Sequence, residues 1–166
     1  VARQAFEKIV LERNEEFKHR WFLDRVREEC GKHGRGLVYL QNYLYKTLPD
    51  SNQDDHIQDI SKGKKLLSAR LRFHKVLIVL DDVDDFEQIK ALADCSWLGP
   101  GSRVIVTTRD KKTLKKCQVN DDKIYEVEKL TPGEAFQLFC RKAFKKNHAP
   151  DDHYKNLSDK FVEYAS

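Results

Sequence analysis

Two stretches of the sequence end apolar runs with side chains suited to binding metal ions and phosphates. The first, KVLIVLDDVDD, reaches Asp81 and Asp82, and the second, GSRVIVTTRD, reaches Thr107, Thr108 and Arg109. Two adjacent carboxylates at the mouth of a sheet stay ionised only if a cation such as Mg²⁺ or strong donors compensate them. Arginine binds phosphate oxygens through two parallel hydrogen bonds. Two neighbouring strands of this kind would therefore form a site for magnesium and a terminal phosphate.

Each stretch taken alone also has a simpler interpretation. The paired aspartates could only cap a turn into a helix that begins at Phe86, because such pairs commonly end strands. Arg109 could be a surface arginine that pairs with Asp110 or Asp85. The two stretches in combination favour the phosphate site.

Short strands alternate with helices along the chain. From apolar spacing and turn residues we expect strands at 19–26, 75–80, 103–108 and 123–127, and helices at 1–13, 37–48, 64–73, 86–93, 132–144 and 152–165. This alternation predicts an α/β fold with a mostly parallel sheet covered by helices on both faces. Ligands of such sheets bind beyond the carboxyl ends of the strands, which is where the paired aspartates lie.

The two helices closest to the C-terminus carry clear local signals. Thr131 is placed to cap the first of them, with Pro132 at its first position and Glu134 completing a capping box. We expect the apolar face of this helix to consist of Phe136, Phe139, Cys140 and Ala143. We expect the last helix to bury Tyr154, Leu157, Phe161 and Tyr164.

The composition argues against several classes of protein. Lys and Arg total 31 against 27 Asp and Glu, so the net charge is only +4. The locally basic stretches KKTLKK and RKAFKK lack an aromatic stacking face, and we expect no nucleic-acid partner. The cysteines and histidines have no zinc-ligand spacing. The longest apolar run, Val76–Leu80, is far shorter than the ~20 residues of a membrane span. No signal peptide is visible, so we expect an intracellular protein.

Four blocks of the sequence, in order, resemble the NB-ARC nucleotide-binding domain of plant disease-resistance proteins. LIVLDDVDD is similar to the Walker B block of that family, and Asp84 stands where other members carry tryptophan, which is typical of the Toll/interleukin-1-receptor-type subclass. WLGPGSRVIVTTRD resembles the block with the sensor arginine. FKHRWFLDRVREEC and KIYEVEKLTPGEAFQLFCRKAF resemble the block after the first helix and the segment that leads into the helical ARC region.

The resemblance implies roles for the residues found above. Asp81 would coordinate Mg²⁺, Asp82 would orient or activate the attacking water, and Arg109, with Thr108 beside it, would contact the terminal phosphate. The family implies a P-loop NTPase-like fold and a switch that holds ADP at rest and ATP when signalling, with slow hydrolysis. Residues 1–130 would be a partial nucleotide-binding domain and residues 131–166 the beginning of the helical ARC region. The expected partners are the nucleotide, other receptor domains and further receptor copies, in the cytoplasm or nucleus.

Two features depart from the family pattern. No G-x-x-x-x-G-K-[ST] motif, which would cradle the phosphates, occurs in the 166 residues, and the chain begins at Val1 without any methionine. The final residues stop before the point where a G-L-P-L motif would follow. We therefore expect a piece of a longer protein that binds nucleotide weakly on its own. The alternative is a nucleotide-free interaction module that pairs with full-length receptors.

The departures also predict an open sheet. In the family's fold, the strand that enters the phosphate loop lies between the sensor strand and the last strand. Since the sequence offers no such strand, residues 103–108 should present an unpaired edge. Residues 123–127 should either separate from the sheet or close directly against that edge.

Overall fold

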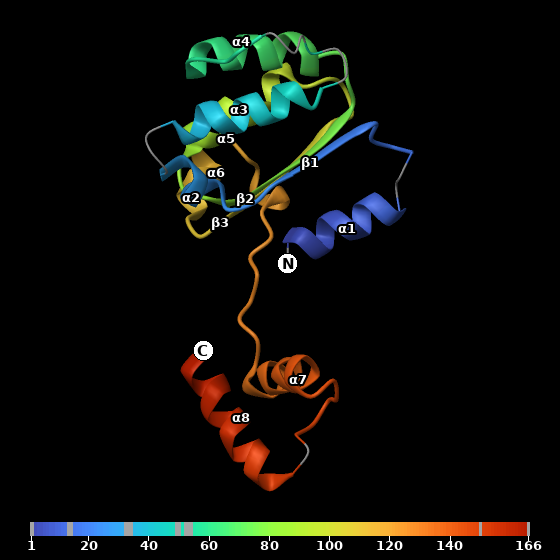
Figure 1. The fold of residues 1–166 in the computed structure, drawn as a ribbon, viewed down its shortest axis with the longest axis vertical. Coiled ribbons are helices and arrows are strands. Elements are labelled where there is room, and N and C mark those ends of the chain that lie inside the picture. Colours follow the sequence, from blue (N-terminus) through green and yellow to red (C-terminus); the bar gives the residue numbers. More distant parts are fainter. Residues whose placement is uncertain are drawn as a thin grey trace. The chain divides into compact units, whose positions relative to one another are not determined.

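A computed structural model describes residues 2–12, 15–31, 35–48, 51, 55–149 and 151–165. The chain divides into two compact units, Val1–Asp121 and Asp122–Ser166 (Figure 1). The first unit contains the sheet and the second contains the last two helices.

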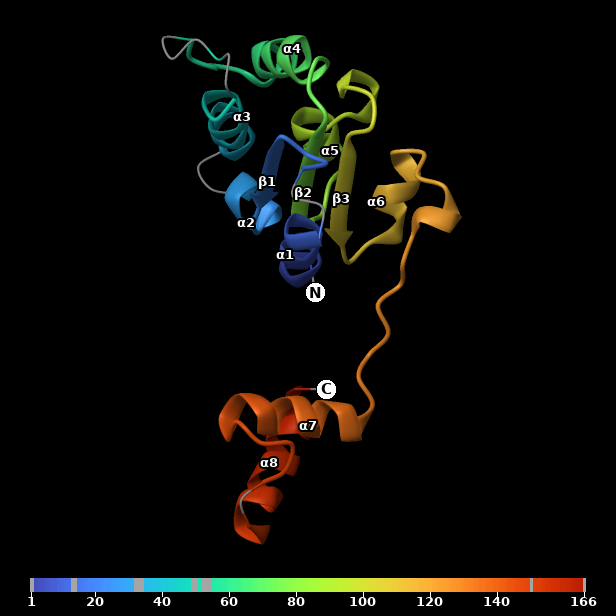
Figure 2. The same ribbon diagram turned by 90° about the vertical axis from the view of Figure 1, so that its right-hand side faces the viewer.

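The first unit is built on a three-stranded parallel sheet (Figure 2). Its strands are β1 (His19–Leu23), β2 (Val76–Val83) and β3 (Arg103–Thr108), in the order β1-β2-β3. In the register, Ile78 of β2 pairs with Trp21 on one side and Val104 on the other. Val76–Leu80 is fully buried, as expected for an apolar run in the central strand of a parallel sheet. The predicted α/β fold with a parallel sheet is confirmed.

Helices lie on both faces of this sheet (Figures 1 and 2). They are α1 (Ala2–Glu12), α2 (Val26–Gly31), α3 (Gly36–Lys46), α4 (Ile60–Leu71), α5 (Phe86–Leu92) and α6 (Lys111–Lys116), with short 3₁₀ turns η1 (Cys95–Trp97) and η2 (Asp121–Lys123). The helices α3, α4 and α5 pack against one another on one face, and α1 lies on the other. The predicted helix at 1–13 is thus present as α1, and its predicted end residues 1 and 13 lie outside the described residues. None of the described helices has the length and apolar character needed to span a bilayer.

A polar side chain joins the three helices of the packed face. Gln41 of α3 is fully buried, and its Nε2 donates to the carbonyl oxygen of Ile60 at 3.2 Å and to that of Ala91 at 2.9 Å. Gly63 of α4 lies directly beside this amide, because a Cβ there would meet Gln41 Oε1. The helix layer behind the sheet is therefore fixed by a specific contact as well as by apolar packing.

The structure corrects the predicted strands in two places. The first strand ends at Leu23, short of the predicted Val26. Val26 instead begins the short helix α2, where its side chain is fully buried. The predicted strand at 123–127 is wrong: these residues are a 3₁₀ end and irregular chain, with Tyr125 84% exposed. A strand needs a partner for its backbone groups, and no described strand pairs with this segment. The outer edge of β3 has no strand partner among the described residues either, so the predicted open edge is confirmed.

The second unit consists of α7 (Pro132–Ala143) and α8 (Asp152–Ala165). Thr131 and Glu134 form the predicted capping box, and the rings of Phe139 and Phe161 stack at 5.9 Å between centroids. On the predicted face of α7, Cys140 is buried, Phe136 and Phe139 are half-buried and Ala143 is exposed. The predicted burial of the apolar face of α8 is wrong. Its four residues are all exposed, in the fractions Tyr154 46%, Leu157 41%, Phe161 61% and Tyr164 93%. Two helices alone cannot enclose a core.

Candidate functional site

The predicted site residues converge at the carboxyl ends of the strands. A cleft of about 710 Å³ opens at the ends of β2 and β3 and at the turn into α2. It is lined by Arg25, Arg27, Glu28, Asp81, Asp82, Thr107, Thr108 and Arg109. The structure therefore brings together all four residues to which the sequence assigned a role: Asp81, Asp82, Thr108 and Arg109.

A threonine hydroxyl joins the two aspartates to the neighbouring strand. Thr107 Oγ1 donates to Asp81 Oδ1 at 2.6 Å and accepts from the backbone N–H of Asp82 at 2.9 Å. The β2–β3 ladder is irregular between Leu80 and Val83, so the backbone amide of Asp82 leaves the regular pairing. The hydroxyl supplies the hydrogen bond that the ladder lacks there, which fixes the Asp81 carboxylate and the backbone of Asp82 at the strand end.

Asp82 lies between two arginines that come from different elements. Arg27 Nη2 of α2 is 2.9 Å from Asp82 Oδ2, and Arg109 Nε, just beyond β3, is 3.3 Å from Asp82 Oδ1. The aspartate side chain is 23% exposed. Its backbone has a φ of +54°, in the left-handed region. Each carboxylate oxygen of Asp82 thus has its own guanidinium partner.

Arg109 is a surface arginine, with 77% of its side chain exposed, but the capping and pairing partners of the simpler interpretations are wrong. The residue that caps α5 is Asp85, whose Oδ1 accepts from the backbone N–H of Glu87 at 3.0 Å. Asp110 caps α6 instead of pairing with Arg109, because its Oδ1 accepts from Lys112 N at 2.9 Å. The paired aspartates and the arginine are therefore free of these capping tasks and face the cleft.

Thr108 lines the cleft but its hydroxyl shapes the next turn. Its Oγ1 accepts from the backbone N–H of Asp110 at 3.1 Å, which helps set the start of α6. A role in contacting a cofactor stays a prediction for this residue.

Sequence reasoning missed Arg25 and Arg27. Both follow β1, so this strand, like β2 and β3, delivers charged side chains to the shared carboxyl edge. Arg25 Nη1 pairs with Glu28 Oε2 at 3.1 Å, and its φ of +50° is uncommon for a residue with a long side chain. The signal lies in the stretch DRVRE, which directly follows Leu23 at the end of β1. A predicted strand that ended at Leu23 would have placed these charged residues at the same sheet edge as the other two motifs.

The donor set of the cleft fits a magnesium-bound phosphate. Three guanidinium groups and the hydroxyl of Thr108 can bind phosphate oxygens, and the carboxylates of Asp81 and Asp82 are ligands that Mg²⁺ prefers. Among the described residues no three His, Cys, Asp or Glu side chains gather as a metal cluster. A magnesium ion held here would therefore take its remaining ligands from phosphate and water, as is usual for this metal.

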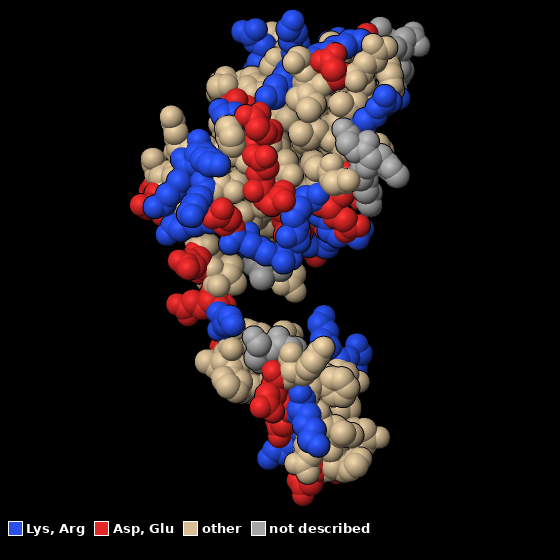
Figure 3. All heavy atoms as spheres, turned by 90° about the vertical axis from the view of Figure 1, so that its left-hand side faces the viewer, with Lys and Arg blue, Asp and Glu red and all other residues tan. Residues whose placement is uncertain are grey.

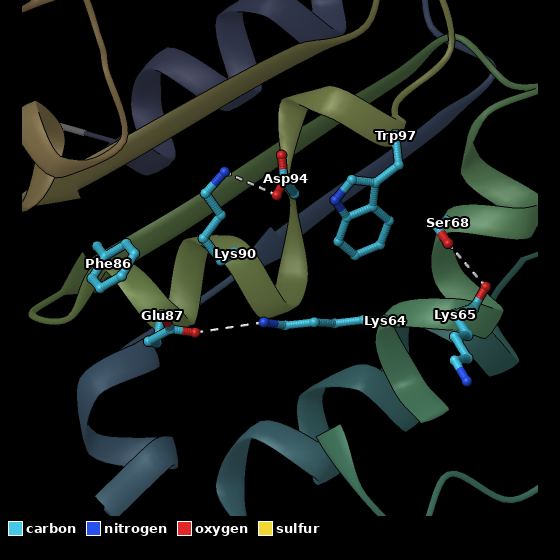
Figure 4. A pocket seen from close by; sticks show the side chains of 8 residues that line it. All are labelled: Lys64, Lys65, Ser68, Phe86, Glu87, Lys90, Asp94 and Trp97. Atoms are coloured by element: carbon cyan, nitrogen blue, oxygen red, sulfur yellow. Dashed lines mark hydrogen bonds and ion pairs between the residues drawn. The ribbon is translucent and has the colours of Figure 1, made fainter. Parts of the chain in front are cut away.

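A second cavity, of about 420 Å³, lies among α4, α5 and η1 (Figure 4). Two of its lysines are matched by acids: Lys64 Nζ is 3.5 Å from Glu87 Oε2, and Lys90 Nζ is 3.0 Å from Asp94 Oδ2. Charges that are satisfied internally leave little basis for binding an anion. This cavity is a weaker candidate than the cleft at the strand ends.

Thiol chemistry is disfavoured at three of the four cysteines. Burial, aided by the nearby charges of Asp84 and Glu29, raises the pKa of the Cys30 thiol to about 11. Burial also raises the pKa values of Cys95 and Cys117. Since the thiolate is the reactive form, these groups are poor nucleophiles at neutral pH.

Comparisons with known proteins agree with the fold. The NB-ARC domain family model matches residues 30–149. Disease resistance protein RPV1 of Vitis rotundifolia is 39% identical over 150 residues, which is 90% of this chain and 10% of that protein. Disease resistance protein RUN1 of the same species is 36% identical over 166 residues, or 99% of this chain and 12% of that protein. TMV resistance protein N of Nicotiana glutinosa is 37% identical over 169 residues, or 99% of this chain and 14% of that protein.

A parallel sheet flanked by helices, with acidic and basic side chains gathered at its carboxyl edge, is the architecture of a P-loop NTPase-like domain. Within that class, the chain belongs to the NB-ARC domain family. It spans about a tenth of the length of the curated relatives that it matches.

Proposed function

We propose that this chain is part of an ADP/ATP-binding switch in a plant immune receptor of the Toll/interleukin-1-receptor-type subclass. The relatives named above are disease-resistance proteins, and Asp84 stands at the position that distinguishes the subclass. In this proposal residues 1–130 belong to the nucleotide-binding domain and residues 131–166 begin the helical ARC region. The receptor acts in the cytoplasm or nucleus, where it signals through its other domains and through further receptor copies.

The observation that carries the proposal is the meeting of Asp82 and Arg109 at 3.3 Å in a cleft at the carboxyl ends of the strands. In this proposal Asp81, whose carboxylate is hydrogen-bonded by Thr107, binds magnesium and Asp82 orients a water molecule. Arg109 and Thr108 contact the terminal phosphate. When bound, Mg²⁺ would neutralise phosphate charge. A site that reads the terminal phosphate can distinguish ATP from ADP, which is what a switch requires.

Titration with a fluorescent ADP or ATP analogue tests this function. The 166-residue chain alone should bind weakly, because its sequence has no G-x-x-x-x-G-K-[ST] motif to supply the loop amides and lysine. A longer protein that carries this motif upstream of residue 1 should bind tightly, and Asp81→Ala there should weaken the dependence of binding on magnesium. Asp122→Ala is the matched control, because Asp122 forms an exposed ion pair with the neighbouring Lys123. Tight binding by the 166 residues alone, or equal magnesium dependence in the two variants, would contradict these assignments.

A nucleotide-free interaction module is the second candidate function. The exposed apolar side chains of α8 favour it, because contiguous exposed apolar surface is typical of protein–protein contact. The two functions make opposite predictions for Asp81→Ala and Arg109→Ala in the longer protein. A switch would lose its regulated immune output with either change, whereas an interaction module would keep its partner binding with both.

A further inference from the structure

We propose that Arg27 is a second phosphate-binding arginine of the cleft, and that Asp82 competes with phosphate for Arg27 and Arg109. This inference rests on the proposed function and adds the regulation of the same site. In the arrangement seen here, both guanidinium groups are turned onto the Asp82 carboxylate. A polyphosphate that enters the cleft would take over the two arginines and release Asp82.

The position of Arg27 is set by the core of the unit. It is the second residue of α2, directly after Val26, which is fully buried. The helix α2 contacts both β2 and α3. The guanidinium of Arg27 therefore approaches the end of β2 from a fixed direction, opposite in the sheet order to Arg109 beyond β3. Two arginines from separate elements can bind phosphate oxygens from two sides.

Exposure and distance show that the two arginines are held unequally. The contact to Arg27 is 2.9 Å with 42% of that side chain exposed, while the contact to Arg109 is 3.3 Å with 77% exposed. Ion pairs at this degree of exposure are weak in water, because solvent screens both charges. A phosphate group carries more charge than a carboxylate and offers more acceptor oxygens. Both arginines should therefore exchange their ion pair with Asp82 for a contact with a triphosphate. Arg27 is the more strongly held by Asp82, through the shorter and less exposed ion pair.

The backbone around the cleft supports a functional role. Among the described residues, the non-glycine positions with a left-handed φ are Arg25, Asp82, Gln118 and Lys145, and two of these four line this cleft. Strained backbone concentrates at sites where the surrounding structure holds it for function. Arg25 is the less available cation, because it already pairs with Glu28 on its own segment at 3.1 Å.

The test is a titration of the 166-residue chain with inorganic triphosphate in magnesium-free buffer, followed by NMR chemical shifts. Arg27→Ala and Arg109→Ala should each weaken binding about tenfold, the usual effect of losing a hydrogen bond to a charged group. Arg27→Lys should restore only part of the affinity, because lysine lacks the planar fork of donors. Asp82→Asn should strengthen binding several-fold, since it removes the competing charge. Arg103→Ala at the opposite end of β3 is the matched control and should leave the affinity unchanged.

A readout that needs no variant is the Nε resonance of each arginine in the unmodified chain. Both the Arg27 and Arg109 resonances should shift on addition of triphosphate, and the Arg103 resonance should not. If Arg27→Ala binds as tightly as the unmodified chain while Arg109→Ala is weakened, Arg27 is only a structural ion-pair partner. If Asp82→Asn fails to strengthen binding, the competition is refuted. No binding of triphosphate at all refutes the inference, while nucleotide binding by the longer protein separately decides the proposed function.

Discussion

Lys90 and Asp94 form a residue pair whose stability contribution should depend on pH (Figure 4). Burial raises the pKa of Asp94, but hydrogen bonds from Ser96 and Lys90 outweigh it and hold the pKa below its ordinary value of 3.8. The hydrogen bond to Asp94 raises the pKa of Lys90 above its ordinary 10.5. Because the pKa of Asp94 is lowered on folding, this group adds stability at pH values above its ordinary pKa of 3.8. That stability is lost as the pH falls through the pKa of the folded protein. A raised lysine pKa adds stability below 10.5 that is lost as the pH rises through the folded value.

Asp94→Asn should therefore lower the free energy of unfolding at neutral pH by at most about 1 kcal/mol, since the pair is partly exposed. Asparagine keeps the cap on Ser96, so the change isolates the charge. The difference from the unmodified chain should shrink as the pH falls below 3.8 and vanish once the pH has passed the lowered pKa of Asp94, where the protonated carboxyl is as uncharged as the asparagine amide. Urea unfolding at neutral and acidic pH measures it, with the exposed Asp122→Asn as control. A difference that persists in acid would show that packing, and not charge, is lost.

At the residue scale, the sequence predicted the parts of the site that are local patterns. Carboxylates directly after an apolar run, and an arginine directly after the next one, lie at strand ends whatever the rest of the fold does. The contribution of Arg27 could not be found in this way, because its partner Asp82 is far away in the sequence and is brought near only by the pairing of β1 with β2. The bridging hydroxyl of Thr107 depends likewise on the ladder irregularity before Val83.

At the element scale, β3 should be less protected against hydrogen exchange than the central strand β2. Its residues Val104–Val106 are half-buried and have a neighbouring strand on one side only, whereas Leu77–Val79 of β2 is fully buried between two strands. Backbone amides that open without global unfolding exchange faster. Hydrogen exchange followed by NMR should therefore show lower protection for Val104–Val106 than for Leu77–Val79. Equal protection in a monomer that unfolds cooperatively would mean that the open edge does not lower the local stability of β3.

The sequence could predict the elements whose signals are local, but not those that depend on a distant partner. The capping box at Thr131 and the apolar run of β2 are complete within a few residues, so their elements form as expected. The segment at 123–127 has a strand-like pattern, but β-propensity takes effect only when a partner supplies hydrogen bonds and packing. The helix α2 is only 6 residues long, too short for its apolar spacing to stand out against a continued strand.

At the scale of the whole molecule, exposed apolar surface is concentrated in the second unit. In residues 122–166 the exposed large apolar side chains are Tyr125, Val127, Leu130, Leu138, Tyr154, Leu157, Phe161 and Tyr164. An apolar cavity of about 570 Å³ lies among Leu130, α7 and α8. On the first unit, acidic and basic side chains lie side by side on the face shown in Figure 3. Exposed apolar surface drives association in water.

We therefore expect the isolated chain to be marginally stable and to self-associate as its concentration rises. Sedimentation velocity should show a growing fraction of large species, which Leu138→Ser and Phe161→Ser together should reduce because both side chains line the apolar cavity. Leu11→Ser is the matched control: Leu11 is 82% exposed on α1 but stands outside that cavity, so its change should have little effect. If the double variant associates as strongly as the unmodified chain, association does not depend on the apolar cavity of the second unit. The open edge of β3, which these substitutions leave unchanged, would then be the surface through which the chains associate.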